Sequence, residues 1–244
     1  MEHAKGFRRQ VAVVTGGGTG VGAALAVALG QAGAVVHLVG RRPEKLQMIA
    51  TRIVNEGGQA LCHSGDLSTP AGQLDLAQRL EEGLSALHIL IQNAAAYVDG
   101  NIADADPSDF DMLFQTNVRA PYLLTRALLP MLQRQRGQVV FVNSSSGVTA
   151  KPSSAQYDAT KHALKAIADS LRCEVNPLGI RILSVYLGKT ATDMQERIHD
   201  FHGKPYRPEL LLQPCDVASV VMNALSLPPT AEVTDIHIRP MIKT

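Results

Sequence analysis

The sequence predicts an α/β fold in which a doubly wound parallel sheet of about seven strands carries helices on both faces. Two observations support this prediction: apolar runs of strand length recur along the chain, and longer segments of helical periodicity separate them. With 244 residues, 45% of them hydrophobic and 18% charged, the chain can bury a large core. Because no repeat or composition shift marks a boundary, we expect a single domain over residues 1–244.

Each element follows from its local pattern. The strands are expected at 11–15, 35–39, 60–63, 88–92, 138–143, 180–186 and 233–238. The helices are expected at 22–32, 43–56, 69–86, 110–134, 154–176 and 214–225. Pro43 supports the second helix, since proline is well tolerated in a first helical turn. Residues 193–213 break the alternation and contain Pro205 and Pro208, so we expect a long loop that serves as a substrate lid.

Charge and cysteine content exclude several classes of protein. The 23 basic and 22 acidic residues give a formal charge of +1, which provides no general field for nucleic acid or an anionic membrane. Cys62, Cys173 and Cys215 are widely spaced, so neither a disulfide framework nor a metal site is predicted. No apolar run is long enough to span a bilayer, and no cleavage signal is present. The expected location is the cytoplasm.

The segment TGGGTGVG, residues 15–22, places five glycines directly after the first predicted strand. At the start of a helix, backbone amides and the helix dipole can hold a phosphate group. The pattern Gly18-x-Gly20-x-x-Ala23 fits the general dinucleotide fingerprint loosely, whereas Thr15-Gly16-x-x-x-Gly20-x-Gly22 fits a longer variant completely. These spacings favour a Rossmann-type dinucleotide site, and a purely structural turn is the alternative.

The second strand indicates which dinucleotide is bound. Its end carries Arg41 and Arg42, where an acidic residue usually holds the ribose hydroxyls. Guanidinium groups suit a 2′-phosphate, so NADP(H) is preferred over NAD(H), although a solvated arginine pair is the alternative. Asp66, after the third strand, can accept a hydrogen bond from an adenine amino group. From the residues alone, a turn cap is the preferred interpretation of Asp66.

Tyr157 and Lys161 lie four residues apart in a predicted helix, so their side chains share a face. A free phenol titrates near 10, and a neighbouring ammonium group would stabilise the phenolate and bring its pKa toward neutrality. Ser144 ends the fifth strand, where its hydroxyl can hydrogen-bond a substrate carbonyl oxygen. Chance spacing and a serine-rich turn are the alternatives.

Together these motifs resemble the short-chain dehydrogenase/reductase family over essentially the whole chain. The resemblance rests on Thr15-Gly16-x-x-x-Gly20-x-Gly22, Asp66, Asn93-Ala94, Asn117, Ser144 and Tyr157-x-x-x-Lys161. It implies that Tyr157 is the catalytic acid/base and that Ser144 orients the substrate oxygen. Lys161 would tune Tyr157 and hold the nicotinamide ribose, and Asn117 would complete a proton relay through water.

The resemblance also supplies the expected cofactor contacts, and two departures from the family pattern affect them. The expected contacts are Thr15, Gly16, Gly18, Thr19, Gly20, Val21, Gly22, Arg41, Arg42, Asp66, Leu67, Asn93, Ala94, Tyr157, Lys161, Gly188, Thr190 and Thr192. Ala95 stands where the family has glycine, and Leu187 where it has proline. These changes alter the backbone beside the cofactor without removing a group needed for hydride transfer.

The resulting prediction is an NADP(H)-dependent oxidoreductase that interconverts a carbonyl and an alcohol of a small molecule. A cofactor-sensing protein without turnover and an epimerase or dehydratase are the alternatives. The lid mixes both charge signs, so it predicts no preference for anions, and His199 and His202 are expected to be solvated. The resemblance further implies a homodimer or homotetramer formed through the helices at 110–134 and 154–176.

Overall fold

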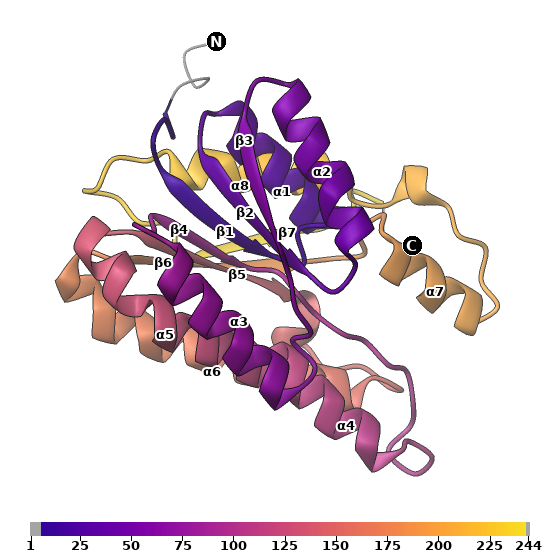
Figure 1. The fold of residues 1–244 in the computed structure, drawn as a ribbon. Helices are drawn as coiled ribbons and strands as arrows, with labels where there is room; N and C mark the ends of the chain where they lie inside the picture. Colours follow the sequence, from indigo (N-terminus) through magenta and orange to yellow (C-terminus); the bar gives the residue numbers. More distant parts are fainter. Residues whose placement is uncertain (1–5, 243–244) are drawn as a thin grey trace.

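The computed structural model describes residues 6–242. Within this range seven parallel strands form one sheet in the order β3-β2-β1-β4-β5-β6-β7, with helices on both faces (Figure 1). The strands are β1 (Val11–Thr15), β2 (Val35–Gly40), β3 (Gln59–Ser64), β4 (Ile89–Gln92), β5 (Gln138–Ser144), β6 (Arg181–Leu187) and β7 (Asp235–Ile238). The predicted fold class is confirmed.

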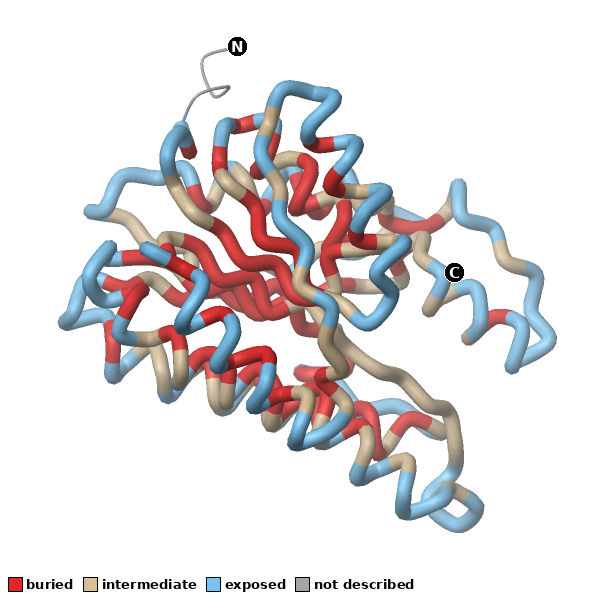
Figure 2. The backbone as a smooth tube through the Cα atoms, in the orientation of Figure 1, coloured by how far each residue is buried: buried red, intermediate tan, exposed pale blue. Residues whose placement is uncertain are grey.

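The helices cover the sheet in two layers with separate apolar cores. They are α1 (Gly20–Gln31), α2 (Pro43–Asn55), α3 (Pro70–Gly83), α4 (Pro107–Phe114), α5 (Ala120–Gln135), α6 (Ala155–Val175), α7 (Asp193–Phe201) and α8 (Pro214–Leu225). Leu25 of α1 and Val217 of α8 pack in one core, and Leu80 of α3 and Leu124 of α5 pack in the other. Figure 2 shows the buried central strands between these layers. Burial on both faces explains why the strands appear in the sequence as continuous apolar runs.

The order in which successive strands are added to the sheet reverses at β1. This strand pairs with β2 on one side and with β4 on the other, so the connections that leave β1 and β4 diverge to opposite faces. In open α/β sheets, ligands bind outside the carboxyl ends of the strands at such a switch point. The topology therefore places the site beyond Thr15 and Gln92.

Two elements differ from the sequence prediction. The expected helix at 110–134 is α4 and α5 joined by a π-helical turn, η2 (Gln115–Arg119). The expected loop at 193–213 contains α7, which lies away from the sheet (Figure 1). The Thr192 hydroxyl caps α7 by accepting a hydrogen bond from the Gln195 amide at 3.3 Å. A threonine followed three residues later by glutamine is a recognised helix start, so this signal was present in the sequence.

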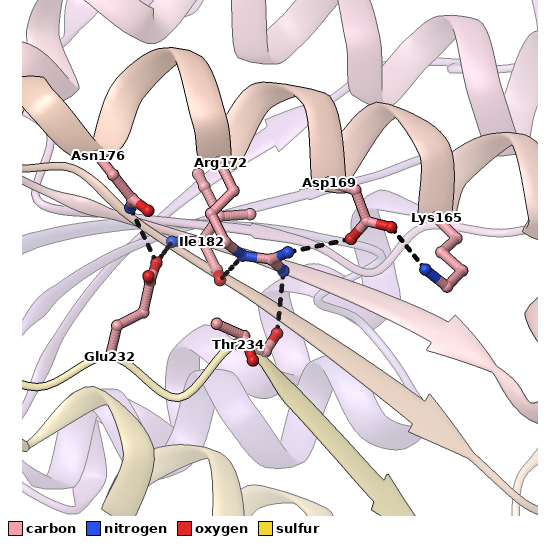
Figure 3. Close-up of polar contacts among 7 residues, drawn as sticks. All are labelled: Lys165, Asp169, Arg172, Asn176, Ile182, Glu232 and Thr234. Atoms are coloured by element: carbon pink, nitrogen blue, oxygen red, sulfur yellow. Dashed lines mark hydrogen bonds and ion pairs between the residues drawn. The ribbon is translucent and has the colours of Figure 1, made fainter.

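A polar network fastens the segment before β7 to α6 and β6 (Figure 3). Arg172 donates to the carbonyl oxygens of Ile182 and Thr234 at 3.3 and 3.1 Å and pairs with Asp169 at 3.0 Å. Glu232 accepts a hydrogen bond from the Ile182 amide at 2.7 Å. The last crossover is thus held by charged groups as well as by apolar packing.

In the part of the chain described, no helix combines the length and apolar character needed to cross a membrane. The thiols of Cys62, Cys173 and Cys215 are free and exposed.

Candidate active site

A cavity of about 740 Å³ opens at the carboxyl ends of the strands. Most of the predicted site residues line it, namely Gly16, Gly18, Thr19, Gly20, Val21, Arg41, Arg42, Asp66, Leu67, Asn93, Ala94, Ser144, Tyr157, Lys161, Gly188, Thr190 and Thr192. Thr15, Gly22 and Asn117 lie behind its wall. The structure thus gathers residues at the ends of β1 to β6, together with Tyr157 and Lys161 of α6, into one crevice.

The glycine segment forms a close-fitting cradle at one end of this cavity. Gly16 and Gly20 have φ values of +66° and +55°, which side chains with a Cβ rarely adopt. A Cβ at Gly22 would lie 2.2 Å from the Gly16 carbonyl oxygen, so α1 can approach the loop only with glycine there. The first turn of α1 has no acidic residue, and the side chain of its N-cap residue, Thr19, makes no capping hydrogen bond. Its amides therefore suit an anionic phosphate, and this end of the cavity fits a dinucleotide.

Thr15 supports the cradle from behind. Its hydroxyl donates to the Ile91 carbonyl at 3.3 Å and accepts from the Asn93 and Ala94 amides at 2.9 and 3.0 Å. The Asn93 side chain in turn donates to the carbonyl oxygens of Thr15 and Gly16 at 3.1 and 3.3 Å. These bonds join the ends of β1 and β4 and fix the backbone that faces the cavity.

Arg41, Arg42 and Asp66 lie together at the β2 end of the cavity. Asp66 accepts hydrogen bonds from the backbone amide and hydroxyl of Ser68 at 2.9 and 2.7 Å, which is the turn cap preferred from the residues alone. Burial would raise the pKa of Asp66, but the bonds from Ser68 and the charge of Arg41 hold it below its usual value. The carboxylate is ionised and lies near a guanidinium group at neutral pH.

Ser144, Tyr157 and Lys161 converge in the middle of the crevice. Burial raises the pKa of Tyr157 to about 12, a shift that the hydrogen bond with Ser144 partly opposes. Burial also lowers the pKa of Lys161 to about 8. The Lys161 ammonium group donates to the Val142 carbonyl at 3.3 Å and lies 5.7 Å from the centre of the Tyr157 ring. Burial therefore dominates both groups, and the expected lowering of the Tyr157 pKa is not seen.

Asn117 occupies the π-helical turn and is 1% exposed. Its side chain exchanges hydrogen bonds with the Ala96 backbone at 2.8 and 2.9 Å and donates to the Thr160 hydroxyl at 3.1 Å. A π-helical turn re-aims side chains within a helix and often occurs at functional sites. Here the turn directs the Asn117 side chain so that its hydrogen bonds link Ala96, after β4, to Thr160 of α6.

Tyr97, Asp99 and His202 reach the cavity without having been predicted as site residues. The Tyr97 ring packs edge-on against Tyr157, with 4.8 Å between ring centres. Its hydroxyl donates to Asp99 at 2.6 Å, and the same carboxylate oxygen lies 3.1 Å from His202. Burial, together with Asp99, raises the pKa of Tyr97. No motif surrounds these residues, so no spacing in the sequence identifies them.

The expectation that His199 is solvated is wrong. The ring is 8% exposed, contacts the Gln195 carbonyl at 2.7 Å and packs edge-on against Tyr206. Packing of α7 against the following segment buries it. His202 instead stays partly exposed and contacts Asp99.

The side chains at the two positions that depart from the family pattern do not fill the crevice. Ala95 and Leu187 both line the cavity, and Leu187 is buried at the end of β6. The next residue, Gly188, packs closely against Arg239: a Cβ added to Gly188 would lie 2.9 Å from the Cβ of Arg239.

Comparison with known proteins agrees with this arrangement. The family model described as short chain dehydrogenase matches residues 10–202. The chain belongs to the short-chain dehydrogenase/reductase family. An uncharacterised oxidoreductase of Staphylococcus aureus (strain USA300) is 30% identical over 233 residues, which cover 95% of this chain and 97% of the relative.

Solved structures of short-chain dehydrogenases/reductases are similar to the whole chain. A metagenomic short-chain oxidoreductase in complex with NADP is 28% identical with a TM-score of 0.83, covering 98% of this chain and 100% of the other. A short chain dehydrogenase from Burkholderia cenocepacia J2315 in complex with NADP is 27% identical with a TM-score of 0.82, covering 97% and 98%. An alcohol dehydrogenase from Thermococcus sibiricus shares the fold, with 23% identity, a TM-score of 0.87 and 97% and 99% coverage.

Proposed function

We propose that this short-chain dehydrogenase/reductase interconverts a carbonyl and an alcohol with NADP(H), with Tyr157 as the acid/base. The observation that carries the proposal is that Ser144, Tyr157 and Lys161 lie in the same cavity as the glycine cradle. When bound, NADP(H) supplies or accepts the hydride. The choice of coenzyme is supported by two similar solved structures, both of which are complexes with NADP.

Different residues of the cavity would hold different parts of the coenzyme. The amides of the glycine cradle would hold the pyrophosphate, and Arg41 and Arg42 the 2′-phosphate. Tyr157 and Lys161 would hydrogen-bond the nicotinamide ribose. The other expected contacts are Asp66, Leu67, Asn93, Ala94, Gly188, Thr190 and Thr192, all of which line the cavity.

The proton chemistry follows from burial. A phenol whose pKa is raised to about 12 keeps its proton at neutral pH, so Tyr157 would meet the substrate in the protonated form that a general acid requires. Ser144 would orient the same oxygen by hydrogen bonding. Asn117 would hold the wall beside them, and its part in a proton relay stays a prediction.

The coenzyme preference is tested by titrating NADPH and NADH into the purified protein. We expect NADPH to bind at least tenfold more tightly, and Arg41→Ala to remove most of that difference while leaving NADH affinity unchanged. Arg134→Ala, at an exposed position near the end of α5, is the matched control. Equal affinities in the wild type, or an unchanged ratio in Arg41→Ala, would remove the 2′-phosphate role.

The catalytic assignment is tested with Tyr157→Phe, which removes only the hydroxyl. Turnover of a carbonyl panel should fall by a factor of about 10² to 10⁴ while NADPH affinity stays within about threefold. Tyr122→Phe, at an exposed tyrosine, should change neither quantity. Tight NADPH binding by a wild type that turns over no carbonyl or alcohol would favour a sensor. Turnover without net coenzyme consumption would favour an epimerase or dehydratase.

The proposal extends to domain organisation, assembly and location. We propose one domain over the whole chain, with α7 and the residues up to 213 as its lid. A homodimer or homotetramer is supported by the partly exposed rings of Phe110, Phe114 and Tyr122 on α4 and α5. Light scattering should then give two or four times the chain mass of 26.1 kDa. We place the protein in the cytoplasm.

A further inference from the structure

Asp99 is a largely buried carboxylate in the segment that follows β4, and two side chains hold one of its oxygens. The Tyr97 hydroxyl donates a hydrogen bond to Oδ1 at 2.6 Å, and Nε2 of His202, 103 residues further along the chain, lies 3.1 Å from the same oxygen. The Asp99 side chain is 6% exposed, and all three residues line the cavity. Two distant segments of the chain thus fix one carboxylate in the cavity wall.

The other carboxylate oxygen of Asp99, Oδ2, is available to a bound molecule. It accepts no hydrogen bond from the described residues, yet it is not among their buried, unpaired polar atoms, so a small molecule can reach it. A carboxylate accepts hydrogen bonds through both oxygens, and such a bond is stronger in a largely buried site than in open water. Oδ2 is therefore suited to a hydrogen-bond donor of a ligand.

Tyr97 connects this carboxylate with the proposed acid/base. The Tyr97 ring packs edge-on against the Tyr157 ring, with 4.8 Å between ring centres, while its hydroxyl is bonded to Asp99. The ring of Tyr97 thus joins the two groups. A small molecule that reacts at Tyr157 can extend along this ring to Asp99.

The backbone on either side of Asp99 is held in place. Ala96 exchanges hydrogen bonds with the Asn117 side chain at 2.8 and 2.9 Å, and the Gly100 amide donates to the Ser153 carbonyl at 3.0 Å. A binding group is most effective when its supports fix it before the ligand arrives. Asp99 meets this condition on both sides.

We infer that Asp99 binds a hydroxyl group of the substrate through Oδ2, while Tyr157 and Ser144 engage the reacting carbonyl or alcohol. The inference rests on the proposed function and deepens it, because it names the substrate class: a hydroxylated carbonyl compound, or the corresponding diol, whose second oxygen lies away from the reacting carbon. A neutral hydroxyl fits better than an ammonium group, because the His202 ring already contacts the carboxylate and would repel a second cation whenever it is protonated.

Isosteric substrate pairs test the inference. With NADPH at saturation, 4-hydroxy-2-butanone is compared with 2-pentanone, and para-(hydroxymethyl)benzaldehyde with para-ethylbenzaldehyde; in each pair a methyl group replaces the hydroxyl. We expect kcat/KM to favour the hydroxylated member of at least one pair by roughly tenfold or more, since hydrogen bonds to a carboxylate are stronger than those between neutral groups. Equal use of both members in both pairs would overturn the inference.

Asp99→Asn tests the oxygen itself. Because Tyr97 and His202 both contact Oδ1, the amide oxygen would take that place, and an NH₂ group that donates would replace Oδ2. The preference for the hydroxylated member should fall to about twofold or less. Asp104→Asn, at an exposed carboxylate in the same connection that does not line the cavity, is the matched control and should keep the wild-type preference. A full preference in Asp99→Asn would contradict the assignment.

Tyr97→Phe tests the support of Asp99. The substitution keeps the ring against Tyr157 and removes the hydroxyl, so Oδ1 loses one of its two contacts. The preference for the hydroxylated member should fall roughly threefold, because the carboxylate is held less firmly. An unchanged preference would show that Tyr97 does not position Asp99.

A binding measurement separates this inference from the proposed redox function. Alcohols are titrated calorimetrically into the full-length protein with NADPH present, a coenzyme form that cannot oxidise them. The pairs are 1,3-butanediol with 2-pentanol and para-benzenedimethanol with para-ethylbenzyl alcohol. We expect a diol to bind roughly tenfold more tightly than its partner and to lose that advantage in Asp99→Asn. If a diol binds in this way but no carbonyl is reduced, the redox function fails and the hydroxyl site stands. If carbonyls are reduced and neither diol is preferred, the hydroxyl site fails alone.

Discussion

At the scale of single residues, burial opposes the charged forms of Tyr157 and Lys161. Burial raises the pKa of Tyr157 and lowers that of Lys161, so both side chains are shifted toward their neutral forms. A charged group that is buried costs folding free energy. Keeping the Lys161 side chain charged in this position therefore lowers the stability of the fold.

Lys161→Met should make the protein more stable at neutral pH although it removes a group that we propose to act in catalysis. In the unfolded chain this lysine keeps its proton up to about pH 10.5, whereas in the folded protein it releases it near pH 8. The unfolded state therefore binds more protons between these values, and the free energy of unfolding of the wild type rises with pH across that window. At pH 7 the buried charge costs about 3 kcal/mol.

Urea unfolding at pH 7 and pH 10 checks this expectation. The variant should be more stable than the wild type at pH 7, and the difference should shrink by pH 10. Lys165→Met, on the same helix but paired with Asp169 at the surface, is the control that should not gain stability. A variant that is less stable than the wild type at pH 7 would contradict the role given to burial.

At the scale of elements, the sequence predicts the strands well and the connections less well. Strand runs such as 11–15 and 138–143 are apolar because both faces are buried, so each run can be recognised from the sequence alone. The π-helical turn at 115–119 could not be predicted, because it preserves the helical periodicity on both sides. α7 was missed because its many charged residues and the later prolines resemble a loop, although Thr192 and Gln195 carried a capping signal.

Thr192→Ala should loosen α7 without unfolding the protein. Loss of an N-cap hydroxyl costs about 1 kcal/mol, which corresponds to a roughly fivefold larger equilibrium constant for opening of the first turns of the helix. The amides of these turns should exchange faster by about the same factor. Hydrogen exchange of the amides over residues 193–201 measures this directly. Ser219→Ala, at an exposed site in α8, provides a comparison in which α7 should exchange at the wild-type rate. Unchanged exchange in Thr192→Ala would mean that other contacts fix α7.

At the scale of the whole molecule, the site depends on contacts between distant segments. The motif residues Tyr157 and Lys161 could be identified from sequence because a helical turn joins them. Tyr97, Asp99 and His202 could not be grouped with them, because only the fold brings these segments together. The polar network of Figure 3 is a contact of the same kind, because it joins the segment before β7 to α6 and β6.

Arg172→Ala should destabilise the whole fold, since this side chain is only 14% exposed and satisfies two backbone carbonyls besides Asp169. We expect the free energy of unfolding to fall by about 1–3 kcal/mol. Urea denaturation at constant pH measures the loss. Arg134→Ala, at an exposed position, should change stability by less than about 0.5 kcal/mol. Equal effects of the two substitutions would show that the network contributes nothing specific.

Helix α7 and the pair Tyr157 and Lys161 belong to different parts of the chain. Tyr157 and Lys161 lie on a long helix packed on the sheet, whereas α7 contributes no residue to either core cluster. Substitutions in α7 are therefore expected to disturb folding less than substitutions in α6. For protein engineering, a small library randomised at exposed positions of α7 is a direct way to vary this edge of the cavity while the fold is retained.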